Sequence, residues 1–156
     1  IPLIIQNAIL KKKLPVYGDG KQIRDWLFVD DHCLAIFKIL KKGKIGETYN
    51  IGGNNELSNI FLIKKICTYL DLKFKKKKKD SFSKQIAFVS DRPGHDRRYS
   101  INSSKIVKEL KWKPKYNFAK GIKFTIEWYL KNADWINIIK SDQKQWMKTN
   151  YSSRID

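Results

Sequence analysis

The chain contains 156 residues, of which 42% are hydrophobic and 13% aromatic, and this is enough to bury the core of one globular domain. No apolar run approaches the roughly 18 residues that cross a bilayer, and the first residues lack a signal-peptide pattern, so we expect a cytoplasmic protein with no membrane partner. The formal charge of +18 suggests a polyanionic partner, but the lysines are scattered through the whole chain, so nucleic-acid binding is only an alternative.

The amino-terminal part predicts a helix followed by extended segments. Apolar residues recur at helical spacing from Pro2 to Leu10, which indicates a short amphipathic helix. Leu14 to Tyr17 should be extended, because Pro15 keeps its predecessor out of the helical region. The glycines of Gly18-Asp19-Gly20 then supply a turn into a second extended stretch, predicted from Arg24 to Val29.

The next segment predicts a helix and a strand. Asp30 or Asp31 is placed to cap a helix that runs from about His32 to Lys41. The expected buried stripe of this helix consists of Ala35, Ile36, Ile39 and Leu40. Glu47 to Ile51 alternates in polarity and is predicted as a strand that ends in the turn Gly52-Gly53.

The second half of the chain alternates helical patterns with polar loops. Asn59 is placed to cap a helix that reaches about Leu70. Phe74 to Asp80 is a lysine run without interleaved aromatics to stack bases, so it is predicted to be a solvated loop. Gln85 to Val89 predicts a strand, and the polar stretch Asp91 to Tyr99 predicts an ordered loop. Two further helices are predicted, from Ser103 or Ser104 to Leu110 and from Phe118 to Leu130.

The two cysteines predict neither a metal site nor a disulfide framework. Cys33 and Cys67 each lie in an apolar helical pattern, without a CxxC partner or a histidine at ligand spacing. We expect both to be small thiols in the hydrophobic core.

Five segments spread over the chain have distinctive sequence motifs. They are Ile1-Pro2-Leu3, Leu14 to Gly20, Gln22 to Leu27, Tyr49 to Glu56 and Asp91 to Tyr99. Together they resemble the dTDP-glucose 4,6-dehydratases, which belong to the extended short-chain dehydrogenase/reductase (SDR) family. The resemblance covers nearly all of the chain.

The resemblance implies an α/β fold, namely the substrate-binding carboxy-terminal portion of an extended SDR. Its late elements would pack on an NAD-binding Rossmann domain that is missing from this chain. Ile1 and Pro2 read like the interior of a longer protein, since proline suits a first helical turn. Residues 1–156 would then form one nucleotide-sugar-binding portion whose partner is the missing amino-terminal half. The family's usual assembly is a homodimer.

The resemblance also implies a reaction. Such enzymes convert dTDP-glucose to dTDP-4-dehydro-6-deoxyglucose with NAD, by oxidation at C4, loss of water across C5 and C6, and reduction at C6. This chain lacks the family's glycine-rich loop, Tyr-x-x-x-Lys pair and Thr-Asp-Glu set, and Gly18-x-Gly20 is no substitute. We therefore expect no NAD site and no catalytic residue in this chain, and inactivity of the chain alone. A non-catalytic binding remnant of a decaying gene is the alternative.

The resemblance assigns eight residues to substrate binding. They are Pro15, Val16, Tyr17, Arg24, Asn59, Arg92, His95 and Tyr151. The first three match the family's base-binding strand, and Arg24, Arg92 and His95 match contacts to the diphosphate and sugars, where guanidinium groups suit paired phosphate oxygens. His95 is expected to donate a hydrogen bond rather than to act as a base.

Several of these residues have a simpler reading that the sequence leaves open. Tyr17 could be a core residue, and Arg24 could form a surface salt bridge. Asn59 could act as a plain helix cap, and Tyr151 could be a frayed near-terminal residue. Lys11 departs from the family, where glycine is usual, and it would cost about 1 kcal/mol if that position needs a left-handed backbone.

Overall fold

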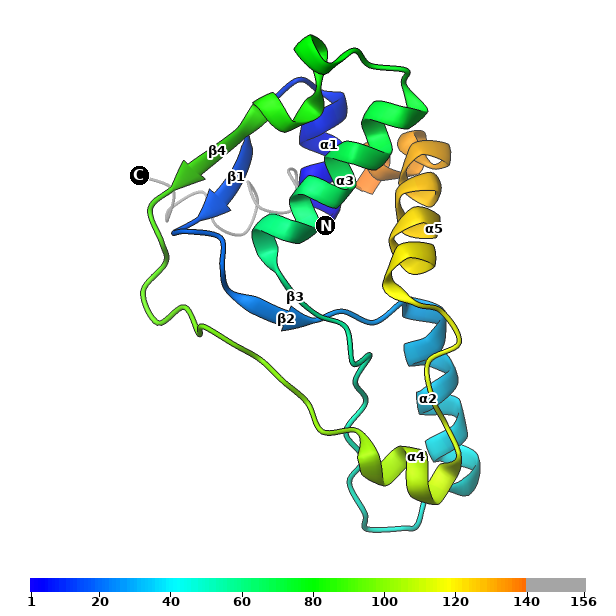
Figure 1. Ribbon diagram of the computed structural model, residues 1–156. Helices are drawn as coiled ribbons and strands as arrows, with labels where there is room; N and C mark the ends of the chain where they lie inside the picture. Colours follow the sequence, from blue (N-terminus) through cyan, green and yellow to red (C-terminus); the bar gives the residue numbers. More distant parts are fainter. Residues whose placement is uncertain (140–156) are drawn as a thin grey trace, which may run out of the picture.

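The computed structural model describes residues 1–139 and contains five α-helices, two short 3₁₀ helices and four strands (Figure 1). The helices are α1 (Pro2–Ile9), α2 (Val29–Lys42), α3 (Asn59–Lys73), η1 (Lys78–Asp80), η2 (Phe82–Gln85), α4 (Ser104–Leu110) and α5 (Phe118–Lys131). The strands are β1 (Leu14–Tyr17), β2 (Ile23–Asp25), β3 (Glu56–Ser58) and β4 (Ile86–Val89).

The four strands form two small sheets that bring distant segments together. β1 pairs in parallel with β4, so that Leu14 lies opposite Ile86 and Tyr17 opposite Val89. β2 pairs antiparallel with β3. The segment after β4 returns along β2, where the Ile23 amide donates to the Arg97 carbonyl over 2.9 Å. The sheets therefore connect the predicted base-binding strand to the polar loop that follows β4.

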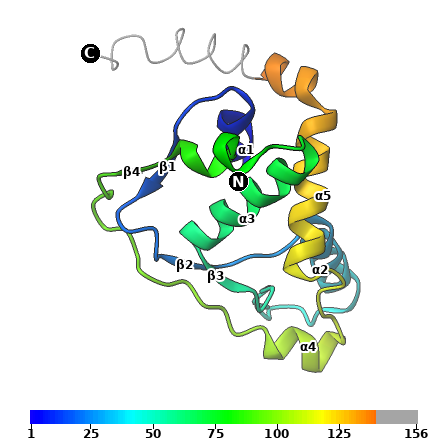
Figure 2. The ribbon, with the colours of Figure 1, turned by 45° about the horizontal axis from the view of Figure 1, so that its top comes forward.

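Two clusters of buried side chains form the core, at opposite ends of the molecule. The larger one packs α1, β1, α3, η2 and α5 around residues such as Ile5, Leu14 and Ile66. The smaller one consists of Ala35, Ile106, Leu110 and Trp112, and joins α2 to α4. Figures 1 and 2 show β2 and β3 between these two groups. In the part of the chain that is described, no helix has both the length and the apolar composition that a bilayer crossing requires.

Several predicted elements are confirmed within a residue or two. β1 has the predicted bounds, the first helix and both late helices are present, and the lysine run after α3 is exposed. That run also contains η1, and the chain then returns to the core at Phe82. Its amide donates to the Asp71 carboxylate over 2.8 Å, which fixes the end of the loop.

The predicted strand from Arg24 to Val29 is wrong at its end, because regular pairing stops at Asp25 and α2 begins at Val29. Phe28 precedes the helix, and no side-chain cap is present, so neither Asp30 nor Asp31 caps it. The Phe28 ring packs against Tyr116 and the α5 backbone at Gly121 instead. Tertiary packing of an aromatic ring thus sets this helix start.

The predicted buried stripe of α2 is only half correct. Ala35 is fully buried, but Ile36 is 43% exposed and Leu40 79% exposed. The helix packs on α4 through its Ala35 side, while Val29, Cys33, Ile36 and Leu40 form an uncovered stripe along the helix. The expectation of a core thiol is therefore wrong for Cys33. Cys67 is buried, as expected, and its burial raises its pKa to about 11.

Two smaller predictions are also corrected. Residues 47–51 are irregular rather than a strand, because no strand within residues 1–139 pairs with them. Ser58 rather than Asn59 caps α3, since the Ser58 hydroxyl accepts the Phe61 amide over 3.4 Å. Asn59 is instead the first residue of the helix.

Lys11 has the left-handed backbone that its position in the family suggested, with a φ of 55°. Glycine adopts this conformation without the steric cost that a Cβ atom imposes. We therefore expect Lys11→Gly to raise the free energy of unfolding by about 1 kcal/mol in urea titrations. Lys12→Gly is the control, because Lys12 has no positive φ, and this change should be neutral or destabilising. Equal effects of both substitutions would contradict the prediction.

Candidate functional site

The predicted base-binding residues lie on β1 in two different environments. Val16 is buried in the larger core cluster, whereas the Tyr17 side chain is 49% exposed next to the start of the Gly18 turn. The alternative of Tyr17 as a core residue is therefore wrong. An exposed ring at the end of a strand is available to stack on a planar ligand.

Arg24 projects from β2 onto the loop formed by Asp91 to Tyr99, which we call the 91–99 loop. Its guanidinium donates to the Asp96 carbonyl over 3.0 Å and lies 4.3 Å above the centre of the Tyr99 ring. These contacts replace the surface salt bridge that was the alternative for Arg24. A hydrogen bond to the Asp96 carboxylate raises the pKa of Tyr99, while the charges of Arg24 and Arg92 oppose that shift. Arg24 therefore lies over the face of the Tyr99 ring.

His95 is held inside the 91–99 loop by a carboxylate. Its Nδ1 atom lies 2.6 Å from Asp91 Oδ1, and its side chain is only 7% exposed. The other oxygen of Asp91 accepts a hydrogen bond from the Gln22 side-chain amide over 2.8 Å. The hydrogen bond from His95 is the main reason that the pKa of Asp91 lies below its ordinary value.

Asn59 lies beside this network at the start of α3. Its backbone amide donates to the Gln22 carbonyl over 3.0 Å, which ties the helix to the turn before β2. Its side chain is half-buried. Tyr151, the eighth predicted residue, lies outside the described residues.

The structure thus connects Arg24 and Asn59 to the 91–99 loop, which carries Arg92 and His95, through contacts that span the chain. Gln22 contacts both Asp91 and Asn59, and Arg24 contacts Asp96 and Tyr99. The sequence did not indicate Gln22, which is only 2% exposed. Gln22 is one of two polar residues, with Lys21, between a glycine turn and a strand. Nothing local marks it for burial, which depends on residues far along the chain.

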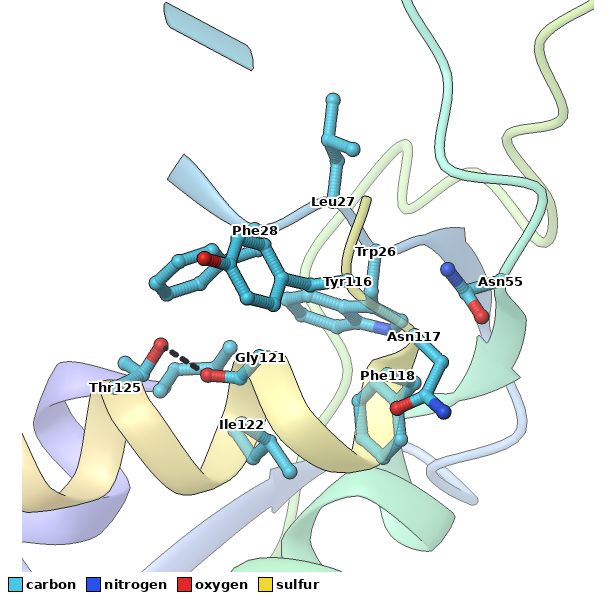
Figure 3. A pocket seen from close by; sticks show the side chains of 11 residues that line it. Trp26, Leu27, Phe28, Asn55, Tyr116, Asn117, Phe118, Gly121, Ile122 and Thr125 are labelled. Atoms are coloured by element: carbon cyan, nitrogen blue, oxygen red, sulfur yellow. Dashed lines mark hydrogen bonds between the residues drawn. The ribbon is translucent and has the colours of Figure 1, made fainter. Parts of the chain in front are cut away.

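A separate, small pocket of about 40 Å³ lies between the segment that joins β2 to α2 and the start of α5 (Figure 3). The rings of Trp26, Phe28, Tyr116 and Phe118 dominate its lining. Among residues 1–139, none of the predicted substrate-binding residues lines it, and no charged side chain does. A diphosphate needs cations or several hydrogen-bond donors, so the 91–99 loop suits such a ligand better than this pocket does.

The comparison with known proteins decides the family. The sequence profile of the GDP-mannose 4,6 dehydratase family matches residues 1–125. The chain belongs to this family. A dTDP-glucose 4,6-dehydratase from Shigella flexneri is 52% identical over 155 residues, which are 99% of this chain and 42% of that protein. One from Xanthomonas campestris pv. campestris is 54% identical over 136 residues.

Solved structures of 4,6-dehydratases have the same fold. The dTDP-glucose 4,6-dehydratase of Bacillus anthracis, in complex with NAD, is 51% identical with a TM-score of 0.74. It covers 86% of this chain, which in turn covers 40% of it. The enzyme from Streptomyces venezuelae, with NAD and TYD bound, is 38% identical with a TM-score of 0.77. The predicted α/β fold of an extended SDR is therefore confirmed, and the chain spans about two fifths of the dehydratases that it matches.

Proposed function

We propose that this chain supplies the nucleotide-sugar site of an NAD-dependent dTDP-glucose 4,6-dehydratase. The observation that carries the proposal is the contact of Arg24 with the 91–99 loop, which itself carries Arg92 and His95, in a chain half identical to such enzymes. The exposed ring of Tyr17 precedes Gly18, which packs against Asp91 of the same loop. In this proposal Tyr17 stacks on the base, and the arginines and His95 hold the diphosphate and sugars. Residues 1–156 form the substrate-binding portion, and no proton-transfer group comes from the described residues.

The glycine turns of this chain do not fit the pyrophosphate of NAD. The amides of Gly18 and Gly20 already donate to the carbonyls of Val89 and Tyr17, and the Gly53 amide donates to Asp25. The Gly18 turn also leads into β2 rather than into a helix amino terminus, which is the usual pyrophosphate site. The proposal therefore places NAD in an amino-terminal half that carries the Rossmann domain.

The uncovered stripe of α2 supports the proposal that an amino-terminal half packs on this chain. Val29, Ile36 and Leu40 are each more than two fifths exposed on one side of the helix. Aligned apolar side chains of this kind normally pack on another element, and the Rossmann half is the element that the family provides. The proposal extends to a cytoplasmic homodimer, as the family resemblance suggests.

Turnover by the full-length protein, meaning this chain with any sequence translated before or after it, tests the proposal. Incubation with dTDP-glucose and NAD should yield a product lighter by one water, detected by mass spectrometry. The chain of residues 1–156 alone should give none, and GDP-mannose should be converted more slowly than dTDP-glucose. No product from the full-length protein would contradict the proposal and favour a non-catalytic remnant.

Replacement of Arg24 tests the proposed diphosphate contact. Arg24→Lys keeps one positive charge but loses the planar fork, so the affinity for dTDP should fall about 10- to 100-fold in calorimetric titrations. Arg98→Lys is the matched control, because Arg98 lies on the 91–99 loop that Arg24 contacts and pairs with Glu56 at 2.5 Å. Its affinity should stay within about threefold of the wild type. A similar loss in both variants would contradict a specific role for Arg24.

A further inference from the structure

The Asp91 carboxylate is fixed on both of its oxygens. Oδ1 accepts the Arg92 amide over 2.9 Å and lies 2.6 Å from His95 Nδ1. Oδ2 accepts the Gln22 side-chain amide over 2.8 Å. Gly18 packs against the same oxygen so closely that a Cβ atom there would lie 2.6 Å from it. The carboxylate therefore has little freedom to rotate.

Gln22 is the buried residue that donates the hydrogen bond to Asp91 Oδ2. Gln22 is 2% exposed, and its backbone carbonyl accepts a hydrogen bond from the Asn59 amide. The side-chain nitrogen must face Asp91, because the reversed amide would place two oxygens against each other. The Gln22 Oε1 atom is buried and has no hydrogen-bond partner among the described residues. Burying an amide oxygen without a hydrogen bond costs free energy of folding. We therefore expect the hydrogen bond from the same amide to Asp91 to have a specific role.

The orientation of Asp91 determines which nitrogen of His95 is free. An ionised carboxylate only accepts hydrogen bonds, so the Nδ1 atom of His95 must carry the proton that it shares with Oδ1. The Nε2 atom has no described hydrogen-bond partner and is the nitrogen that remains for a ligand. In this neutral tautomer Nε2 accepts, so it would take a hydrogen bond from a hydroxyl of the ligand, which departs from the donor role expected from the sequence. Arg97, paired with Asp19 at 2.8 Å, is a further charge close to Asp91.

We propose that Gln22 and Asp91 are positioning residues that fix His95 with its Nδ1 proton on Asp91 and its Nε2 atom facing the nucleotide sugar. This inference rests on the proposed function. It adds a buried support, built from the turn before β2, to the ligand contacts of the 91–99 loop. The support acts through His95 and touches no substrate atom itself.

Exchanging the amide of Gln22 and the carboxylate of Asp91, by Gln22→Glu and Asp91→Asn, tests the proposal in the full-length protein. Gln22→Glu should place two carboxylates in contact and lower the affinity for dTDP about tenfold or more. Adding Asp91→Asn should restore affinity to within about threefold of Asp91→Asn alone, because the amide of the new side chain donates to the glutamate and its oxygen still accepts from His95. Gln6→Glu, in α1, is the control and should leave affinity unchanged, because no hydrogen bond of its side chain to another described residue is lost.

The proton position on His95 gives a second readout that a purely structural role would not change. Nitrogen-15 NMR of the unliganded protein, with His95→Gln to assign the signal, should show the proton on Nδ1 in the wild type. Gln22→Glu should lose this signature, and the double variant should regain it. An Nε2–H tautomer in the wild type, or no recovery in the double variant, overturns the inference. A wild type with the Nδ1 signature that does not bind dTDP overturns the proposed function, and with it the role of Nε2 as a ligand contact.

Discussion

Replacing Asp31 by alanine should lower the free energy of unfolding by about 3 kcal/mol, although Asp31 lies far from the proposed ligand. Its side chain is buried in the first turn of α2. One oxygen accepts the Lys115 amide over 2.9 Å, and the other accepts the Tyr116 amide over 3.0 Å. The substitution would leave two amides without their partner in the segment that joins α4 to α5. Urea titration of the full-length protein measures the loss.

Asp30→Ala is the matched control for this prediction. Asp30 lies one residue earlier in the same first turn, so both substitutions remove the same favourable interaction with the helix dipole. Asp30 is exposed, and its loss should change the free energy of unfolding by no more than about 0.5 kcal/mol. If Asp31→Ala were as mild as Asp30→Ala, the stability of α2 would not depend on its hydrogen bonds to residues 115–116.

Leu40→Asp should act in opposite directions in the two forms of the protein. In the chain of residues 1–156, Leu40 is 79% exposed, and a charge there should raise the yield of soluble monomer. In the full-length protein the Rossmann half would cover this residue. Burial of an unpaired carboxylate there should lower the free energy of unfolding by about 3 kcal/mol. Urea titration and gel filtration of both forms give the comparison.

Leu72→Asp controls for the helix position. Leu72 is 75% exposed and lies in the last turn of α3, as Leu40 lies in the last turn of α2, so the two aspartates meet the same helix dipole. Its effect on unfolding should be the same in both forms of the protein. If Leu40→Asp were equally mild in both forms, the uncovered stripe of α2 would not be the contact surface for the amino-terminal half.

Elements fixed by local chemistry could be predicted from the sequence. Pro15 and the Gly18 turn determine β1, and the apolar spacing of α5 determines that helix, whose cap is the Asn117 side chain. The start of α2 could not be predicted, since Phe28 is placed by Tyr116, which lies far along the chain. The pattern of apolar residues on α2 was visible, but it does not say which side is covered within this chain.

In the candidate site, too, some residues could be predicted from the sequence and others depend on distant parts of the chain. The family resemblance supplied Arg24, Arg92 and His95. The structure places Arg24 over the Tyr99 ring, and both His95 and the Arg92 amide hydrogen-bond to Asp91. It could not supply Gln22, because the hydrogen bond from Gln22 to Asp91 joins residues 69 positions apart. Contacts of this kind depend on the parallel pairing of β1 with β4, which no local pattern reveals.

Hydrogen exchange of the full-length protein, with and without dTDP, tests most directly whether this chain carries the nucleotide-sugar site. We predict slower exchange at the amides of β1, β2 and the 91–99 loop when dTDP is bound. The amides around the apolar pocket of Figure 3, at residues 26–28 and 116–125, should not change. Slower exchange confined to that pocket, or no change at saturating dTDP, would contradict the assignment of the ligand to the 91–99 loop.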